Sequence, residues 1–378
     1  MGKLSGLKTP ALILDQGVLA RNCAAMATRM QRHSVRLRPH VKTAKAARVA
    51  EIATAGQFGG ITVSTLAEAR YFAAQGYRDI TYAVGMVPAK LDEAAALQRR
   101  GVRLGLITDN LEAAEGLAAR SEELGCGFPI LIEVDSGGER AGVAPDSEEL
   151  IALGRLVEAA PALTLEGVLT HAGQSYHCRS IAEVEAVAEA ERDGITTAAS
   201  RLRAVGLPCP VVSAGSTPTA VHARSLEGVT EMRPGVYVFF DLDQVGIGAC
   251  GLADIALSVL ARVIGHNRRA GRILIDAGAL ALSKDVSAGE FMPQAGYGLI
   301  CPLDSNEPIK GLRVADVHQE HGLIASSVGE PPYERFPPGS LLRILPNHAC
   351  ITAAAHNAYQ VVDGGTEVVD RWERVNGW

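Results

Sequence analysis

Residues 103–135 read RLGLITDNLEAAEGLAARSEELGCGFPILIEVD, and this stretch contains the unit from which the fold is built. Residues 103–108 and 129–135 are short segments rich in apolar and β-branched side chains, and an Ala-, Leu- and Glu-rich run separates them. Short apolar segments of this kind are typical of buried strands, and the run between them is long enough for a connecting helix. The stretch therefore predicts one strand–helix–strand unit of a parallel sheet.

The helix of this unit carries start and stop signals. We expect Asp109 to cap a helix over residues 110–124, with Glu112 in its first turn and Gly125 just past its end. A side-chain oxygen at the cap accepts from free backbone N–H groups, and glycine readily adopts the left-handed conformation that ends many helices.

The same alternation continues from residue 35 to residue 240. Eight strands are predicted, at residues 35–42, 60–64, 79–84, 103–108, 129–135, 165–171, 210–215 and 231–240. Further helices are predicted at residues 66–75, 90–100, 147–160 and 181–205. Eight such units predict an α/β fold with a closed (β/α)₈ barrel of the TIM type, and a doubly wound open sheet is the alternative.

Beyond residue 241 the pattern changes to short strands joined by Gly, Pro, Asn and Asp turns. The strands are predicted at residues 255–266, 272–276, 311–318, 340–345, 358–362 and 367–372. This predicts a C-terminal, mostly antiparallel β domain, which residues 11–15 are expected to join. The expected domains are a barrel over residues 16–245 and a β domain over residues 246–378 together with residues 1–15.

Composition narrows the class of protein. The 378 residues carry a net charge of -6 and only 4% aromatic side chains, which argues against nucleic acid and anionic membranes as partners. The seven cysteines are widely spaced, as in proteins of reducing compartments rather than in disulfide frameworks. Neither a signal peptide nor a membrane-spanning run is found, so we expect a cytoplasmic protein that acts on a small molecule.

Lys42 and His171 stand at the ends of predicted strands, where barrels place their active sites. A lysine that loses solvent can form a Schiff base, and Lys42 follows the apolar Val41. His171 could pack against a planar cofactor or act as a base. The ordinary alternatives are a solvated surface lysine and a hydrogen-bonded core histidine.

Two neighbouring loops suit a phosphate group. Gly215, Ser216 and Thr217 follow the seventh strand, and Arg233 and Gly235 follow the start of the eighth. Glycine allows close approach of the backbone, hydroxyls donate hydrogen bonds, and barrels often bind phosphate at these two loops. A reactive lysine together with a phosphate site indicates pyridoxal 5′-phosphate (PLP), although two tight turns would look alike.

Arg140 and His321 are weaker candidates. Arg140 follows the fifth strand and could hold an anionic group of the substrate, but arginine is equally common in exposed loops. His321, in the β domain, is a candidate acid or base.

His348 and Cys350 lie two residues apart in a segment expected to be extended, so both side chains would leave the same face of a strand. Imidazole nitrogen and thiolate sulfur suit Zn²⁺ or a similar divalent ion. Two protein ligands would leave positions open for water or substrate, as catalytic metal sites require. An ordinary half-buried strand is the alternative.

Several motifs, in order along nearly the whole chain, resemble those of fold-type III PLP enzymes, which are alanine racemase-like barrels with a C-terminal β domain. Within that class the chain is most similar to the D-serine dehydratase and D-threonine aldolase branch. The motifs are TPA at residues 9–11, RPHVKT at 38–43, GITVST at 60–65, LTHAG at 169–173, GSTPT at 215–219, GVYVFFD at 235–241, QEHG at 319–322 and PNHAC at 346–350.

The resemblance implies roles for individual residues. Lys42 would hold PLP and then take the Cα proton, and Arg233 matches the arginine that meets the pyridine nitrogen in racemases. His348 and Cys350 would bind Zn²⁺, Mn²⁺ or Co²⁺ beside the cofactor. The cofactor-binding positions implied are His171, Tyr176, Gly215, Ser216, Thr217, Gly235 and Tyr237. A homodimer is also implied.

The resemblance further implies the reaction. Members with His-x-Cys at the metal pair tend to be dehydratases, so we expect a D-3-hydroxy amino acid, such as D-threo-3-hydroxyaspartate or D-serine, to yield a 2-oxo acid and ammonia. The main alternative is a metal-dependent aldolase that cleaves D-threonine-like substrates to glycine and an aldehyde. An amino-acid racemase and a non-catalytic PLP-binding protein are further alternatives.

Overall fold

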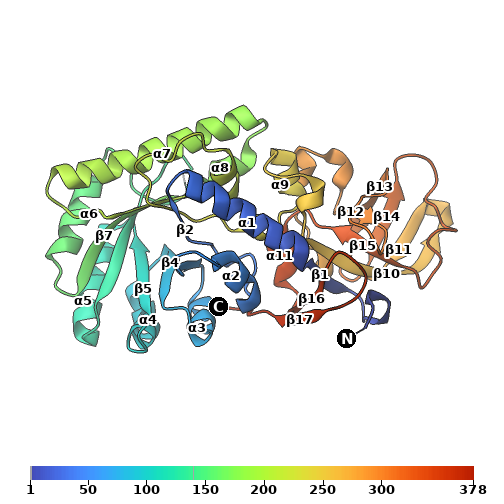
Figure 1. Ribbon diagram of the computed structural model, residues 1–378, viewed down its shortest axis with the longest axis horizontal. Coiled ribbons are helices and arrows are strands. Elements are labelled where there is room, and N and C mark those ends of the chain that lie inside the picture. Colours follow the sequence, from blue (N-terminus) through green and yellow to red (C-terminus); the bar gives the residue numbers. More distant parts are fainter. Residues whose placement is uncertain (1, 139) are drawn as a thin grey trace. The chain divides into compact units, whose positions relative to one another are not determined.

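The computed structural model describes residues 2–138 and 140–378, and its internal contacts divide the chain into two compact units (Figure 1). One unit comprises residues 25–235 and 375–378, and the other comprises the chain up to residue 24 and residues 236–374. Helix α1 (Gln16–Arg32) contributes to both units. The domain limits 16–245 and 246–378 stay a prediction.

The first unit is built on eight parallel strands, which confirms the predicted α/β barrel fold. Their order in the sheet is β2-β9-β8-β7-β6-β5-β4-β3. A parallel bridge between His40 and Thr62 joins the segment after β2 to β3, at the other end of this order, and so links the two edges. The strands are β2 (Arg36–Leu37), β3 (Ile61–Val63), β4 (Asp79–Gly85), β5 (Arg103–Thr108), β6 (Phe128–Glu133), β7 (Leu163–Leu169), β8 (Val211–Ala214) and β9 (Glu231–Met232).

Two of these strands are much shorter than predicted. Strands β2 and β9 have two residues each, where the sequence pattern predicted eight and ten. Pro39 follows β2 and Pro234 follows β9, and proline has no N–H to donate to a sheet. The chain beyond each proline is therefore free to form turns, and these turns carry Lys42 and Gly235.

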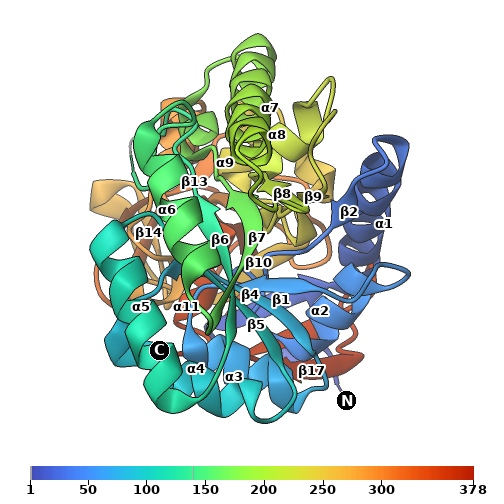
Figure 2. The same cartoon turned by 90° about the vertical axis from the view of Figure 1, so that its left-hand side faces the viewer.

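The helices of this unit pack outside the strands, and Figure 2 shows α3 to α6 around β4 to β7. Asn110, not Asp109, caps α5, because its side-chain oxygen accepts from the N–H of Ala113 at 2.8 Å. Asp109 instead accepts from the N–H of Gly142 at 2.8 Å. The helices are α2 (Ala47–Thr54), α3 (Leu66–Ala74), α4 (Leu91–Gln98), α5 (Leu111–Leu124), α6 (Glu148–Ala159), α7 (Ile181–Ala204) and α8 (Thr217–His222), with short 3₁₀ turns η2 (Pro88–Lys90) and η3 (Gly173–His177).

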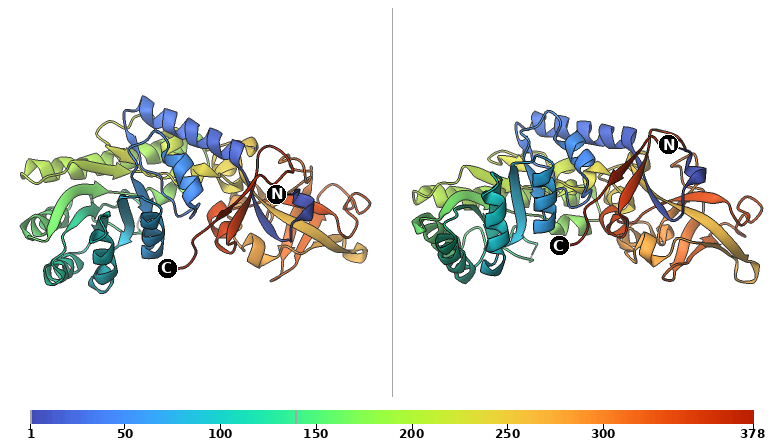
Figure 3. Two further views of the ribbon diagram at one scale, coloured as in Figure 1. Left: turned by 60° about the horizontal axis from the view of Figure 1, so that its bottom comes forward. Right: turned by 90° about the horizontal axis from the view of Figure 1, so that it is seen from below.

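The second unit is a nine-stranded, mostly antiparallel sheet in the order β11-β14-β13-β12-β15-β10-β1-β16-β17. The N-terminal strand β1 pairs antiparallel with β10 and parallel with β16, which confirms its predicted place, and Figure 3 shows it in blue among the orange and red strands. The strands are β1 (Ala11–Asp15), β10 (Leu257–Asn267), β11 (Arg272–Ile275), β12 (Leu299–Cys301), β13 (Leu312–Val317), β14 (Gly322–Ser326), β15 (Leu341–Leu345), β16 (Ala358–Val362) and β17 (Asp370–Glu373).

Strands β12 and β14 were not predicted, and the second unit also contains short helices where only strands were expected. These are α9 (Leu242–Ile247), α10 (Ala279–Leu282) and α11 (Ala349–Ala354), with 3₁₀ turns that include η4 (Val236–Val238) and η7 (Ser287–Glu290). The core beneath β1 is apolar, since Ile13 packs with Leu260 and Val362, all fully buried. Burying one such side chain contributes roughly 2 kcal/mol. Within residues 2–138 and 140–378, no helix has the length and hydropathy that crossing a bilayer requires.

Candidate active site

A cavity of about 230 Å³ opens at the carboxyl ends of the parallel strands. Its lining residues come from the ends of seven of the parallel strands and from the segments that follow them, which is the arrangement by which barrels build active sites. The polar residues that line it are His40, Lys42, Ser64, Glu133, Arg140, His171 and Arg233, and Gly215 contributes backbone.

Lys42 is the only lysine among the described residues that line this cavity. It lies in the turn after β2, and its backbone N–H donates to the ring Nδ1 of His40 at 3.4 Å. Lys45, one turn further on, forms an ion pair with the buried Glu68 at 3.1 Å. The structure thus places Lys42 at the cavity, whereas Lys45 is held in an ion pair with Glu68.

The two histidines of the cavity are neutral. Burial, reinforced by the positive charge of Lys42, lowers the pKa of His171 to about 3 and holds the pKa of His40 well below its usual value. The ring Nδ1 of His171 lies 3.1 Å from the carbonyl oxygen of Gly215, and because a carbonyl only accepts, Nδ1 carries the proton. The Nε2 atom of His171 is therefore an acceptor. The ring of Tyr176, in η3, lies 6.3 Å from that of His171.

The predicted phosphate loop lies at the same end of the barrel. Gly215 has a φ of +117°, and a Cβ there would lie 3.0 Å from the backbone nitrogen of Arg233, so this position requires glycine. Ser216 caps α8 in a capping box with Thr219, and its hydroxyl lies 2.8 Å from that of Ser175. Thr217 is fully buried at the start of α8.

Gly235 and Tyr237 were also expected to bind phosphate, but the structure shows them packed against other parts of the chain. A Cβ on Gly235 would lie 2.9 Å from the carbonyl oxygen of His40, so the glycine lets two strand ends pack closely. Tyr237 is fully buried in η4, which belongs to the other compact unit, and burial raises its pKa well above the usual value. Their proposed contact with phosphate stays a prediction.

Glu191 is a buried residue of this site that sequence reasoning missed. It lies on α7, is 2% exposed, and its Oε1 accepts from the N–H groups of Ala172 at 2.9 Å and of Gly215 at 3.0 Å. The hydroxyl of Thr219 also donates to it, and burial still raises its pKa. One carboxylate thus ties together the loops after β7 and β8, both of which line the cavity.

Arg140 and Glu133 face each other at the cavity, with Nη2 and Oε1 3.9 Å apart. The side chain of Arg140 is 64% exposed, whereas Glu133 is buried at the end of β6. Burial, and then the charge of Asp109, raise the pKa of Glu133. An exposed guanidinium beside a cavity that holds a lysine suits an anionic ligand, as predicted for Arg140.

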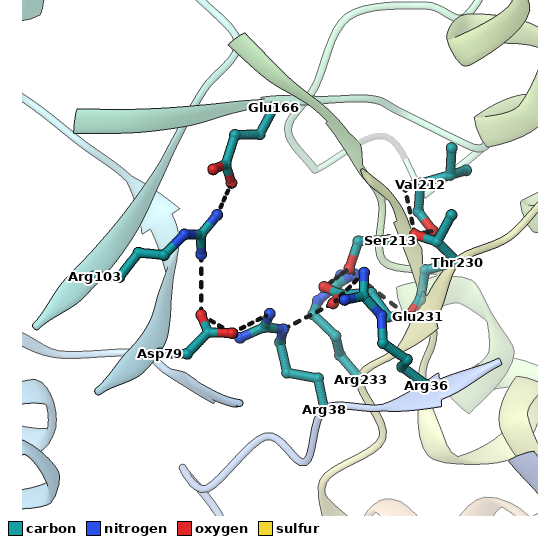
Figure 4. A network of polar contacts seen from close by, with 11 residues as sticks. Arg36, Arg38, Asp79, Arg103, Glu166, Val212, Ser213, Thr230, Glu231 and Arg233 are labelled. Carbon is teal, nitrogen blue, oxygen red and sulfur yellow. Dashed lines mark hydrogen bonds and ion pairs between the residues drawn. The ribbon is translucent and has the colours of Figure 1, made fainter. Parts of the chain in front are cut away.

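Arg233 lines the cavity and belongs to a chain of polar contacts that runs through the barrel (Figure 4). Its Nη1 donates to the hydroxyl of Ser213 at 2.6 Å, and its Nη2 donates to the carbonyl of Thr170 at 2.5 Å. Ser213 donates in turn to Glu231 at 2.7 Å. Glu231 and Ser213 carried no signal in the sequence, since an acid and a serine inside strands are ordinary residues.

His348 and Cys350 belong to the second compact unit, and the prediction that they share a strand is wrong. His348 is the N-cap of α11, and Cys350 lies in its first turn. The N–H of Ala349, at the start of this helix, donates to Asp241 at 2.8 Å. Cys350 still lies in hydrogen-bond contact with the ring of His348, so the pair is close in space.

Asp285 orients the imidazole of His348. The two side chains meet at 2.7 Å through Nδ1 and Oδ2. Burial lowers the pKa of His348, but the bonds to Asp285 and Cys350 outweigh it and raise that pKa to about 11, and the bond to His348 holds the pKa of Asp285 at about 2. A carboxylate on one ring nitrogen is the usual support of a metal-binding histidine, so the donors fit a metal. Among residues 2–138 and 140–378, no cluster of three or more His, Cys, Asp or Glu side chains has metal-binding geometry.

His321 lies in the exposed turn between β13 and β14, where its carbonyl accepts from the N–H of His318 at 2.8 Å. A Cβ on Gly278 would lie 2.5 Å from the backbone of this turn. The structure thus gives His321 a place in a tightly packed hairpin, and its catalytic role stays a prediction.

Comparison with known proteins agrees with this architecture. Residues 14–243 match the family model described as "Alanine racemase, N-terminal domain", and residues 256–362 match "Putative serine dehydratase domain". The chain therefore belongs to the alanine racemase-like family of enzymes, in the group that joins the barrel to a serine dehydratase domain.

The chain is similar over nearly its full length to a dehydratase and to an aldolase. The chain is similar to D-threo-3-hydroxyaspartate dehydratase of Delftia sp. strain HT23, with 48% identity over 98% of both chains. The solved structure of that dehydratase matches with a TM-score of 0.96 and 47% identity, covering 100% of both chains. D-threonine aldolase of Arthrobacter sp. is 30% identical over 98% of this chain and 93% of its own length.

Proposed function

We propose that this chain dehydrates a D-3-hydroxy amino acid to a 2-oxo acid and ammonia with PLP as cofactor, and that D-threo-3-hydroxyaspartate is its first candidate substrate. The observation that carries the proposal is the cavity at the carboxyl ends of the strands, where Lys42 is the only lysine among the described lining residues. The 48% identity to a dehydratase of that substrate over nearly the full chain supports it.

The residues at the cavity fit PLP. Lys42 would hold the cofactor covalently, the face of His171 would lie against its ring, and the Gly215–Thr217 loop would bind its phosphate. When bound, PLP takes up the electron pair left at Cα after proton removal. Lys42 would remove this proton through Nζ.

The other polar residues of the cavity determine which charges surround the substrate. His40 and His171 are neutral, so they do not add to the positive charge of Lys42. Arg140 is exposed at the rim and would bind a carboxylate of the substrate. A dicarboxylic substrate such as 3-hydroxyaspartate fits this guanidinium better than D-serine does.

We also propose a divalent metal, Zn²⁺, Mn²⁺ or Co²⁺, on His348 and Cys350. There it would supply a Lewis acid for the β-hydroxyl, because hydroxide is a poor leaving group. The carboxylate of Asp285 behind His348 supports this proposal. A solved structure of a D-threo-3-hydroxyaspartate dehydratase, 47% identical to this chain, is described as a cysteine-to-alanine mutant in the metal-free form.

The activity test is a product assay on purified protein loaded with PLP and metal. Incubation with D-threo-3-hydroxyaspartate is expected to release equal amounts of ammonia and 2-oxo acid, and Lys42→Ala is expected to release neither. D-serine and D-threonine, assayed in parallel, define the side chain that is accepted. Absence of ammonia from all three substrates would reject the proposal.

The second candidate function is retro-aldol cleavage, which the 30% identity to a D-threonine aldolase favours. It would use the same lysine but break the Cα–Cβ bond. Glycine and an aldehyde in place of ammonia and a 2-oxo acid would establish it in the same assay. Racemisation would invert Cα without releasing ammonia, 2-oxo acid or aldehyde, and cofactor binding without turnover would leave the substrates unchanged.

Two further properties belong to the proposal. We expect a homodimer, which sedimentation equilibrium would test. All seven cysteines are free, which fits a reducing compartment such as the cytoplasm. Location of a tagged chain by microscopy or fractionation would test that expectation.

A further inference from the structure

Arg233 is a buried cation that lines the cavity. It is 4% exposed, and its guanidinium donates to the hydroxyl of Ser213 at 2.6 Å and to the carbonyls of Ala214 at 3.3 Å and Thr170 at 2.5 Å. Within the part of the chain that the structure describes, no Asp or Glu oxygen lies within 4.0 Å of it. Among the described residues, the carboxylates that offset the charge of Arg233 therefore lie beyond ion-pair distance.

Glu231 is one of these carboxylates and acts through Ser213. Glu231 is 1% exposed, and its Oε1 accepts from the Ser213 hydroxyl at 2.7 Å. A serine hydroxyl has one proton, and a carboxylate can only accept, so this proton points to Glu231. The lone pairs of the Ser213 oxygen are thereby turned toward Arg233, and the serine transmits the polarity of the carboxylate.

The far side of Glu231 is balanced separately. Its Oε2 accepts from Nε of Arg38 at 2.9 Å, and the outer nitrogens of Arg38 bind both oxygens of Asp79 at 3.1 Å (Figure 4). Arg103 then joins Asp79, at 3.0 Å, to Glu166. Cations and carboxylates alternate from the amino-terminal strand ends to the cavity. Glu231 therefore faces Arg38, the half-exposed Arg36 at 4.0 Å and, through Ser213, Arg233.

The local electrostatics agree with this geometry. Burial lowers the pKa of Arg233 to about 10, and Glu231 is the first charge that opposes this shift, followed by Glu191 and Glu133. The other charged or titratable groups that face the cavity are Lys42, His40, His171, Glu133 and Arg140.

We propose that Ser213 and Glu231 are positioning residues that hold the Arg233 guanidinium against the cavity and, through it, set the electrostatic environment of the cofactor bound at Lys42. This inference rests on the proposed function, because it requires PLP in the cavity. Neither residue touches the cavity itself, so both act through Arg233.

The test is a pH titration of the visible absorbance of the PLP-loaded protein, which reports the proton on the linkage between Lys42 and the cofactor. The protonated linkage is positively charged, so removing a nearby negative charge destabilises it and lowers its pKa. Glu231→Gln is therefore expected to lower the midpoint, by up to on the order of one pH unit for the loss of one charge at an effective dielectric constant of about 20.

Two serine variants isolate the relay. Ser213→Ala keeps every charge but removes the hydroxyl, and it is expected to lower the midpoint by a smaller amount. Ser213→Thr keeps the hydroxyl and is expected to retain the wild-type midpoint. If Glu231→Gln does not fold, this serine pair carries the test.

Arg103→Gln is the matched control. It removes a charge from the outer, half-exposed end of the same chain of contacts, and its midpoint is expected to equal that of the wild type. Unshifted midpoints in the PLP-loaded Glu231→Gln and Ser213→Ala proteins, or an equal shift in Arg103→Gln, would overturn the inference while leaving the proposed function intact. A wild-type protein that never gains visible absorbance with PLP would overturn both.

Discussion

Replacing Glu191 by alanine should destabilise the barrel unit, because this carboxylate is the shared acceptor of two cavity loops. Its Oε1 accepts from Ala172 N–H at 2.9 Å and Gly215 N–H at 3.0 Å. Both contacts are buried in the folded protein. The alanine variant would leave both N–H groups without a partner.

The cost follows from these contacts. A buried donor left unpaired costs about 1–3 kcal/mol, so two donors give about 3 kcal/mol after relaxation. Thr219 adds little, because its hydroxyl lies 3.4 Å from the carbonyl of Ser216 and can donate there instead. Glu191→Gln keeps a carbonyl oxygen for both N–H groups and is expected to cost about 1 kcal/mol.

Urea unfolding followed by circular dichroism measures this difference. Glu189→Ala is the matched control, because Glu189 lies on the same helix but is 70% exposed and only pairs with Arg192 at the surface. It is expected to change the free energy of unfolding by less than about 0.5 kcal/mol. If Glu191→Ala unfolds at the same urea concentration as Glu189→Ala, the carboxylate does not hold the loops.

Three further predictions concern the cofactor, the metal and pH. Lys42→Ala should remove the visible absorbance of the covalently bound cofactor and lower the rate of ammonia release by at least about 10³-fold; a retained absorbance band would reject Lys42 as the anchor. Asp285→Asn should weaken metal binding roughly 10–100-fold and Cys350→Ala more, as measured by metal analysis after dialysis; unchanged metal content in both would place the metal elsewhere. His171 has a pKa of about 3 in the folded protein against 6.5 for a free side chain, so the stability that depends on neutral His171 is present above pH 6.5 and is lost as the pH falls toward 3, with a slope of about 1.4 kcal/mol per pH unit. His171→Asn should flatten the pH dependence of the urea midpoint in this window, and an unaltered slope would contradict the assignment.

Local sequence signals were sufficient for the positions of the parallel strands and for the residues at their ends. The strand over 103–108 was predicted with its exact limits, and all eight parallel strands lie where the alternation placed them. Lys42, His171, Gly215 and Arg140 could be predicted as cavity residues because parallel strands of a barrel all end at the same face.

The local signals failed where a distant residue decides the conformation. The segment after β15 was predicted to be extended, yet α11 begins at Ala349. His348 provides no side-chain cap there, and the N–H of Ala349 is instead accepted by Asp241, which is 108 residues away in the sequence. Helices this short are not stable by themselves, so such a contact determines whether they form.

By itself, the sequence determined the order of the eight parallel strands, the barrel and the lysine at its open end, because these follow from side-chain periodicity and from where strands stop. Only the tertiary structure decided which buried or half-buried acids support the two sites. Glu191, Glu231 and Asp285 meet Gly215, Ser213 and His348 across 24, 18 and 63 residues of sequence. A buried carboxylate is stable only where several donors converge on it, and that convergence is a property of the folded chain, which no local pattern records.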